Sequence, residues 1–277
     1  MPGEDALLSP EEIQRQLLKY EPTMRNRIIE KVILAALGVI PWIGGFLSAA
    51  VSLKTEEPNV KTQSLQNKWL AEHEIKLQKL METLAEMEAR FQSLGAQIEE
   101  RVNSEEYLEL VRKGFRIWDE SDTDEKKRYV ANTLTNAAGT RLTTDDVIRL
   151  FLDWLRLYHE AHFAVIRKIF QEPGVTRYDI WKELKGEFPR EDSADADLYK
   201  LLIRDLNIGG VIRQARDTTE DGQFLKRRRT PSKSRSSSTM ESAFEDSKPY
   251  VLTELGKQFV HYTMNEVVTR IDQTPET

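Results

Sequence analysis

Apolar and polar residues alternate along most of this chain with the three- and four-residue spacing of amphipathic helices. The first helix start is clear, because Ser9-Pro10-Glu11-Glu12 combines a capping serine, a proline suited to the first helical position and a glutamate that closes a capping box. The pattern predicts a mostly α-helical protein. Its expected parts, in order, are N-terminal helices with an apolar helical hairpin (1–58), a long heptad helix (59–103), a helical middle region (104–170) and a C-terminal winged-helix module (171–277).

The apolar hairpin is the strongest departure from amphipathic spacing. Residues 32–53 carry no charged side chain, and Pro41 and the pair Gly44-Gly45 interrupt the run. A straight helix of this length would measure about 33 Å, enough for a hydrocarbon core of about 30 Å. Alternatively, the proline and glycines allow two short helices that fold back, which would either dip into one leaflet or form the core of a soluble bundle.

We expect this segment to contact a membrane, with both of its flanks on the cytoplasmic side. Its Val, Ile, Leu and Phe residues favour insertion by roughly 5 kcal/mol in total, and the glycines, serines and proline offset part of that gain. The expected location is therefore the cytoplasmic side of the membrane, or the cytoplasm with conditional insertion. The predicted membrane-contacting residues surround the bend: Val39, Ile40, Pro41, Trp42, Ile43, Phe46 and Leu47.

The block from Val60 to Val102 reads as one long helix whose apolar residues alternate spacings of three and four. This is the seam of a coiled coil, held for about three heptads. Gly95 weakens the helix locally but leaves the stripe intact. The seam needs a partner, which is either the following helices of the same chain or a second copy. As an oligomerisation surface it would consist of Leu77, Leu80, Leu84, Met87, Phe91, Leu94 and Ile98.

Three more helices are expected between Asn103 and Phe170, each beginning at a capping pattern. The last is expected to run without a break from Thr143 to Gln171, with His162 on its buried face. The pair His159 and His162 lacks the i, i+4 spacing of zinc proteases and has no third ligand, so we interpret His162 as a core residue.

The C-terminal part has the order of a winged-helix unit, in which two short helices are followed by two strands, an insert between the strands and a closing helix. The polar insert covers 218–248. We expect the second short helix, Asp195 to Leu206, to place four leucines inward: Leu198, Leu201, Leu202 and Leu206.

The charges of this module do not indicate one kind of partner. Its second helix carries Asp195, Asp197 and Asp205 against Lys200 and Arg204, so phosphates would be repelled as much as attracted. The insert is different, because basic residues cluster in it beside several serines. They are either part of a flexible solvated loop or contacts for an anionic surface or a nucleic acid: Lys226, Arg227, Arg228, Arg229, Lys233 and Arg235.

Composition narrows the chemistry. The 277 residues are 39% hydrophobic and 31% charged, contain no cysteine and four histidines, and have a net charge of -6. Disulfides and thiolate metal sites are excluded, and no global field favours nucleic acid. No phosphate-binding loop, nucleophile elbow or catalytic carboxylate pair stands out. The sequence therefore predicts a protein that is not an enzyme, with no cofactor, no metal and no small-molecule substrate.

A family resemblance rests on the order of several segments. The bend Ile40-Pro-Trp-Ile-Gly-Gly45 precedes Asp124-Glu-Lys-Lys-Arg-Tyr-Val-Ala-Asn-Thr-Leu-Thr-Asn136, a helix from Phe151 to Phe170, and Leu252-Thr-Glu-Leu-Gly256. From about Asn103 to Tyr262 the chain resembles the Abi-alpha class of bacterial abortive-infection proteins. The apolar hairpin alone is similar to α-helical pore-forming toxins. The Abi-alpha resemblance implies antiviral defence against phages through the membrane and supplies no catalytic residues.

These features support two functions of different classes. The first is a membrane-associated effector or scaffold, in which 32–53 engages the bilayer, the heptad helix forms an oligomer and the C-terminal module binds a protein or nucleic acid. The second is a soluble winged-helix DNA-binding regulator or adaptor, in which the apolar hairpin is buried as core.

Overall fold

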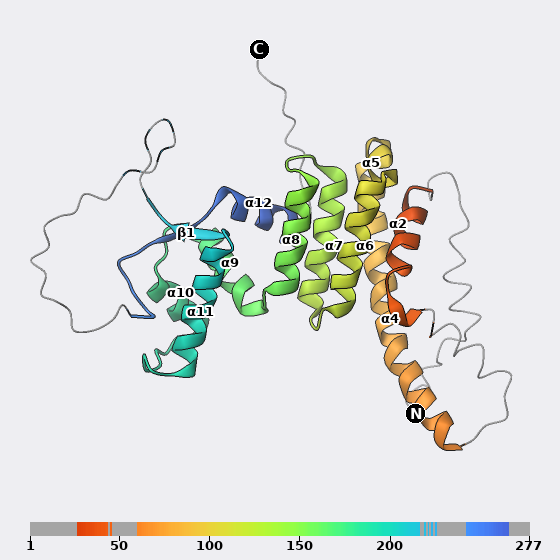
Figure 1. Cartoon of the computed structure of the whole chain (residues 1–277), viewed down its shortest axis with the longest axis horizontal. Coiled ribbons are helices and arrows are strands. Elements are labelled where there is room, and N and C mark those ends of the chain that lie inside the picture. The colour runs from red at the N-terminus through yellow and green to blue at the C-terminus, as the bar shows by residue number, and fades with distance from the viewer. Residues whose placement is uncertain are drawn as a thin grey trace, which may run out of the picture. The chain divides into compact units, whose positions relative to one another are not determined.

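A computed structural model describes residues 27–43, 45, 60–216, 219, 221, 223, 225 and 242–265. Within these ranges the protein is mostly α-helical, with one small two-stranded antiparallel sheet near the C-terminal end (Figure 1). The chain divides into two compact units: unit 1 holds the described residues up to Arg156, and unit 2 is Leu157–Asn265. The division thus falls at Leu157, whereas the sequence placed a boundary after residue 170.

Unit 1 is a helical bundle with α7 at its centre. Figure 1 shows α7 between α6 and α8, with α2 and α4 beyond α6. Helix α7 packs on both α6 and α4, and α2 packs mainly on α6. The elements are α2 (Arg27–Leu37), α4 (Val60–Leu94), the 3-10 turn η1 (Ala96–Ile98), α5 (Glu99–Asn103), α6 (Glu105–Glu120), α7 (Asp124–Gly139) and α8 (Asp145–Leu157).

Helix α7 is buried on every side from Tyr129 to Ala138, polar residues included. Its buried polar groups form hydrogen bonds within α7 or with a neighbouring helix, as buried polar groups generally do. The Thr133 hydroxyl donates to the Tyr129 carbonyl (2.8 Å), and the Asn132 amide oxygen accepts from Arg90 of α4 (2.5 Å). Helix α7 therefore forms the core of unit 1.

The heptad seam of α4 is buried within unit 1. Helix α4 packs along α7, and Leu94 lies against Gly139 at the end of that helix. The sequence left two possible partners for the seam, the helices of the same chain or a second copy. In the structure the seam packs against helices of its own chain, so self-association through it would require those contacts to open. The buried seam residues are Leu77, Leu80, Leu84, Met87, Phe91 and Ile98, and Leu94 is half-buried.

The prediction of one unbroken helix from Val60 to Val102 is wrong at Gly95. This residue has φ +74°, a left-handed conformation that glycine adopts at little cost, and it ends α4. The chain then continues through η1, in which Ile98 is still buried, and into α5.

The described residues of unit 2 form four helices and the small sheet. Strand β1 pairs with β2 in the register Ile212↔Leu252, and Val175 bridges to Tyr250. Helix α9 packs against β2, α10, α11 and α12, so it forms the core of the unit. The elements are α9 (Glu160–Gln171), α10 (Arg177–Lys185), α11 (Ala194–Ile208), β1 (Ile212–Gln214), β2 (Tyr250–Leu252) and α12 (Glu254–Thr263).

The helix expected to be continuous from Thr143 to Gln171 instead breaks after Leu157 and restarts at Glu160. The restart has a local cause, because the backbone N–H of His159 donates to Nδ1 of His162 (3.1 Å) and satisfies a donor at the start of α9. His162 is 5% exposed, so its interpretation as a core residue is confirmed.

Two of the four leucines predicted to face inward from α11 do so. Leu202 and Leu206 are buried, whereas Leu198 is 51% exposed and Leu201 is 39% exposed. Tyr199 fills the core in place of Leu198 and Leu201, so the buried side of α11 is rotated from the predicted one. The Tyr199 hydroxyl donates to the Arg177 carbonyl (2.7 Å). An apolar stripe is therefore left on the outside of this helix.

The buried Tyr158 predicts how unit 2 responds to alkaline pH. Burial, and then the charge of Asp205, raise the pKa of the Tyr158 phenol to about 12 from its ordinary 10.0. Between these values the unfolded chain loses this proton and the folded chain keeps it, so the free energy of unfolding falls as pH rises. We expect Tyr158→Phe to reduce that loss by roughly 2 to 3 kcal/mol. Denaturant unfolding from pH 10 to pH 12 measures it.

The control for this measurement is Tyr178→Phe, which removes the hydroxyl of a tyrosine that is 38% exposed. The free energy of unfolding of this variant should depend on pH as it does in wild type. Equal alkaline losses in Tyr158→Phe and wild type would contradict the prediction.

Candidate functional site

A groove between α2 and α6 is the most distinctive surface feature of unit 1. Its volume is about 320 Å³. Leu34, on its wall, is 62% exposed. The lining residues are Lys31, Leu34, Ala35, Gly38, Val39, Leu108 and Arg112.

The opposite face of α2 belongs to the core. Ile29, Val32 and Ala36 are buried, and so are Ile40 and Ile43 of the turn that follows. An apolar stripe that is wider than a partner helix can cover leaves a second apolar face at the surface. Helix α2 is therefore part of the bundle on one side and an open apolar surface on the other.

The structure places the residues predicted to contact a membrane in different environments. Ile40 and Ile43 face the protein interior, while Pro41 is exposed and Val39 lines the groove. Phe46 and Leu47 lie outside the described residues.

Trp42, the seventh residue of that set, is bound to the protein. Its indole Nε1 donates to Oδ1 of Asp119 at the end of α6 (2.6 Å), and its ring lies edge-on to His73 of α4 (5.2 Å between centroids). These contacts join the turn after α2 to two other helices and so fix the orientation of the groove.

The rim of the groove carries positive charge. Lys31 is exposed, and Arg112 forms an ion pair with Glu105 (2.5 Å) on the surface of α6. An exposed pair of this kind contributes at most about 1 kcal/mol, so an anion can compete for the guanidinium. The combination of an apolar wall and a cationic rim fits an anionic amphiphile, such as a phospholipid or a fatty acid.

Among the residues that the structure describes, none of the helices is both long enough and apolar enough to span a membrane.

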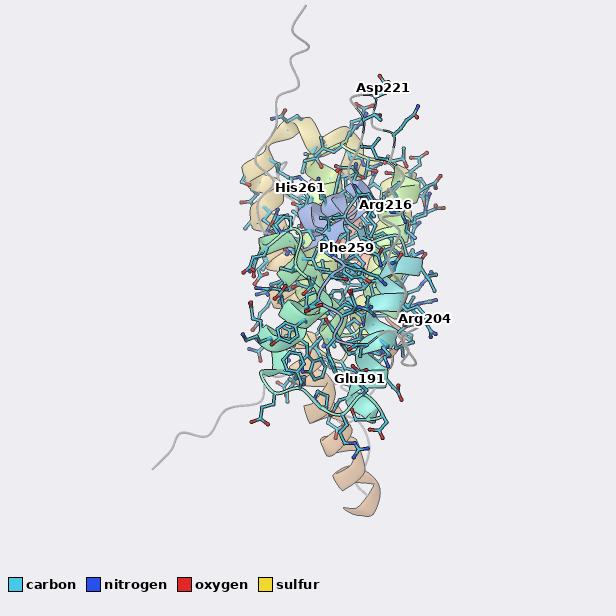
Figure 2. The ribbon with its side chains drawn as sticks, turned by 90° about the vertical axis from the view of Figure 1, so that its left-hand side faces the viewer. Glu191, Arg204, Arg216, Asp221, Phe259 and His261 are labelled. Carbon is cyan, nitrogen blue, oxygen red and sulfur yellow. The ribbon has the colours of Figure 1, made fainter. Side chains whose placement is uncertain are left out.

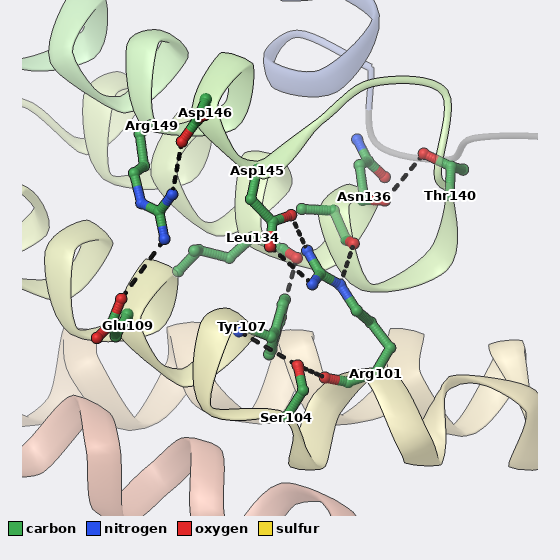
Figure 3. Close-up of polar contacts among 11 residues, drawn as sticks. Arg101, Ser104, Tyr107, Glu109, Leu134, Asn136, Thr140, Asp145, Asp146 and Arg149 are labelled. Carbon is green, nitrogen blue, oxygen red and sulfur yellow. Dashed lines mark hydrogen bonds and ion pairs between the residues drawn. The ribbon is translucent and has the colours of Figure 1, made fainter.

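A second cavity, of about 330 Å³, lies between α5 and the N-terminal end of α8 and is polar. Figure 3 shows the polar contacts beside it. Arg101 binds both carboxylate oxygens of Asp145, donates to the Ala137 carbonyl and lies over the ring of Tyr107 (5.2 Å). The Tyr107 hydroxyl donates to the Leu134 carbonyl (2.9 Å), and burial raises the pKa of this phenol strongly. The contacts of Arg101 and Tyr107 therefore join α5, α6, α7 and α8 at this cavity.

No cluster of three or more potential metal ligands occurs among the described residues. The basic residues predicted to contact an anionic surface or nucleic acid, Lys226 to Arg229 with Lys233 and Arg235, lie outside them. Among the described residues of unit 2, the outer face of α11 is the surface of interest, because it has exposed leucines and an acidic N-terminal turn.

No protein-family model, curated protein or solved structure matches this chain.

The groove was not apparent from the sequence. Two of its lining residues, Leu108 and Arg112, come from α6, and their position beside α2 depends on tertiary packing. Helical spacing indicated only that α6 is amphipathic. The one signal available beforehand was the excess of apolar residues around Leu34, which exceeds what a single buried face requires.

Proposed function

We propose that this protein is a membrane-associated effector or scaffold without catalytic activity, and that α2 provides its lipid-binding surface. The observation that carries the proposal is the groove between α2 and α6, which combines the exposed Leu34 with the cations Lys31 and Arg112. Such a surface suits a helix that lies in the plane of the membrane interface.

The energetics make this contact reversible. Burying a leucine in lipid contributes about 2 kcal/mol, and each lysine or arginine near an anionic surface contributes about 1 kcal/mol. A few such contributions give a weak contact that depends on lipid composition. Conditional association from the cytoplasm, as proposed from the sequence, is consistent with that range.

Unit 2 supplies the second part of the proposal. Its order is helix α9, the bridge at Val175, helices α10 and α11, strand β1, the insert and strand β2. This is the order of a winged-helix module, and we propose that fold for unit 2. Its α11 carries three aspartates and two cations, which favours a protein partner over the alternative of DNA binding.

The resemblance to the Abi-alpha class connects membrane association with a biological role. Membrane association of a bacterial abortive-infection protein fits a role in antiviral defence. The resembling segments, however, include the buried α7, so they support a shared fold more directly than a shared mechanism.

The lipid-binding proposal predicts the effect of one substitution. Leu34→Asp places a charge on the apolar wall and should lower the apparent affinity for vesicles about tenfold or more, since burial of one leucine is lost and a carboxylate is added. Flotation of the full chain with phosphatidylglycerol–phosphatidylcholine vesicles measures the bound fraction.

Ile75→Asp is the matched control, because Ile75 of α4 is 61% exposed, nearly the same as Leu34, and does not line the groove. This variant should float like wild type. Lys31→Glu should weaken binding to anionic vesicles in particular. Equal flotation of Leu34→Asp, Ile75→Asp and wild type would refute the proposal, as would failure of the wild-type chain to bind these vesicles.

A further inference from the structure

The outer face of α11 has the pattern of a helix that pairs with another helix. Leu201 is 39% exposed and Ile208 is 78% exposed, and with Ala194 they recur every seven residues. Residues seven apart lie along one line of a helix, and two such helices can pack along that line. Leu198, 51% exposed, widens the stripe on one side.

The charges beside the stripe are arranged asymmetrically along the helix. Asp197 and Arg204 are also seven residues apart, so both lie on the same flank of the stripe, with the acid toward the N-terminus and the base toward the C-terminus. Figure 2 labels Arg204 on α11, and its side chain is 67% exposed, with a 4.0 Å approach to Asp205 as its ion pair.

This arrangement is complementary to itself only when the helix is reversed. In an antiparallel pair with a two-fold axis near Leu201, the same flanks of both helices face each other in opposite order. Asp197 of one copy then lies opposite Arg204 of the other, and the contact occurs twice. In a parallel pair each flank would instead face the opposite flank of the other helix, so Asp197 and Arg204 would not meet.

We infer that α11 is a homodimerisation surface, on which a second copy of this chain packs antiparallel about Leu201. The two-fold axis places Leu201 against Leu201 and Ile208 against Ala194, so the stripe is covered along its whole length. A DNA duplex would meet an apolar stripe beside the carboxylates of Asp195 and Asp197, and neither attracts phosphate.

The size of the surface sets the strength of the dimer. Helix α11 has 15 residues and is therefore about 22 Å long. One helix pair of this length buries less than the roughly 800 Å² per partner of a standard interface. We therefore expect a dimer that dissociates at micromolar concentration. Sedimentation of the full chain over a series from about 1 µM to about 1 mM measures the dissociation constant.

Charge reversal tests the register. Asp197→Arg and Arg204→Asp each place like charges together at both symmetric contacts, and each should raise the dissociation constant at least about tenfold. The double variant restores opposite charges and should return to the wild-type value. An equimolar mixture of the two single variants should form a heterodimer more tightly than either forms a homodimer.

Lys257→Glu on α12 is the matched control, since it reverses one charge on a residue whose side chain is 56% exposed and is distant from α11 in sequence. It should dimerise like wild type, with circular dichroism confirming that all variants are folded. The inference fails if wild type stays monomeric throughout the series, if the single reversals leave dimerisation unchanged, or if the folded double variant does not recover it.

Discussion

Gly256→Ala is expected to destabilise unit 2 by about 3 kcal/mol, which would make it among the most damaging single-methyl additions in the protein. A Cβ at Gly256 would overlap the carbonyl oxygen of Val211, and that carbonyl cannot move aside freely because it already accepts from the backbone N–H of Thr253 (3.0 Å). Helix α12 would have to shift, and the shift would disturb its N-cap, where Thr253 Oγ1 accepts from Gly256 (2.9 Å). Chemical denaturation measures the loss.

The sign of this effect separates packing from helix propensity. Alanine favours a helix over glycine by about 1 kcal/mol, so propensity alone predicts that Gly256→Ala stabilises. Lys257→Ala, the next residue of the same turn, is the control and should change the free energy of unfolding by less than about 0.5 kcal/mol. A stabilising or neutral Gly256→Ala would show that α12 does not pack against Val211 in this way.

Asp145→Ala is expected to cost about 3 kcal/mol of stability in unit 1. The carboxylate of Asp145 binds Arg101 through both oxygens, and the side chain of Arg101 is only 14% exposed. Removing the acid leaves a largely buried guanidinium with the Ala137 carbonyl and the Tyr107 ring as its described contacts. Thermal or denaturant unfolding measures the difference.

The neighbouring Asp146 provides the control. It lies in the same first turn of α8 and pairs with Arg149 (2.8 Å), but its side chain is 89% exposed. Asp146→Ala loses a comparable interaction with the helix dipole and should cost less than about 1 kcal/mol. The double variant Arg101→Met/Asp145→Ala should be more stable than Asp145→Ala alone, because no unpaired charge remains. Equal losses at the two aspartates would contradict the role assigned to Arg101.

Much of the fold could be predicted because helical spacing reports which side of a helix is buried. The helices of the middle region keep their apolar residues inside, including Phe115, Leu134, Phe151 and Ile169, all of which are buried. The two strands expected on either side of the insert are present as β1 and β2. These segments have one buried face and a distinct polar face, so the local pattern is sufficient.

The errors arose where local preference does not decide the structure. Gly95 was expected to be tolerated inside a helix, yet its positive φ ends α4. Leu198 and Leu201 have the hydrophobicity of core residues, but Tyr199 occupies the interior, so both leucines remain outside. The groove of α2 depends on α6, which no pattern within α2 could reveal.

The hydrogen bond from the Ala215 N–H to the Pro249 carbonyl (2.8 Å) brings the two ends of the insert together just beyond the sheet. Because those ends are already joined, the chain between them closes a loop whose entropic cost rises only with the logarithm of its length. Doubling that length would cost about 0.6 kcal/mol. The end of this stretch is less tolerant of change, because Ala243 and Phe244 are buried and the Phe244 ring packs against Trp181 and Tyr199, so replacing these residues would disturb the core of unit 2.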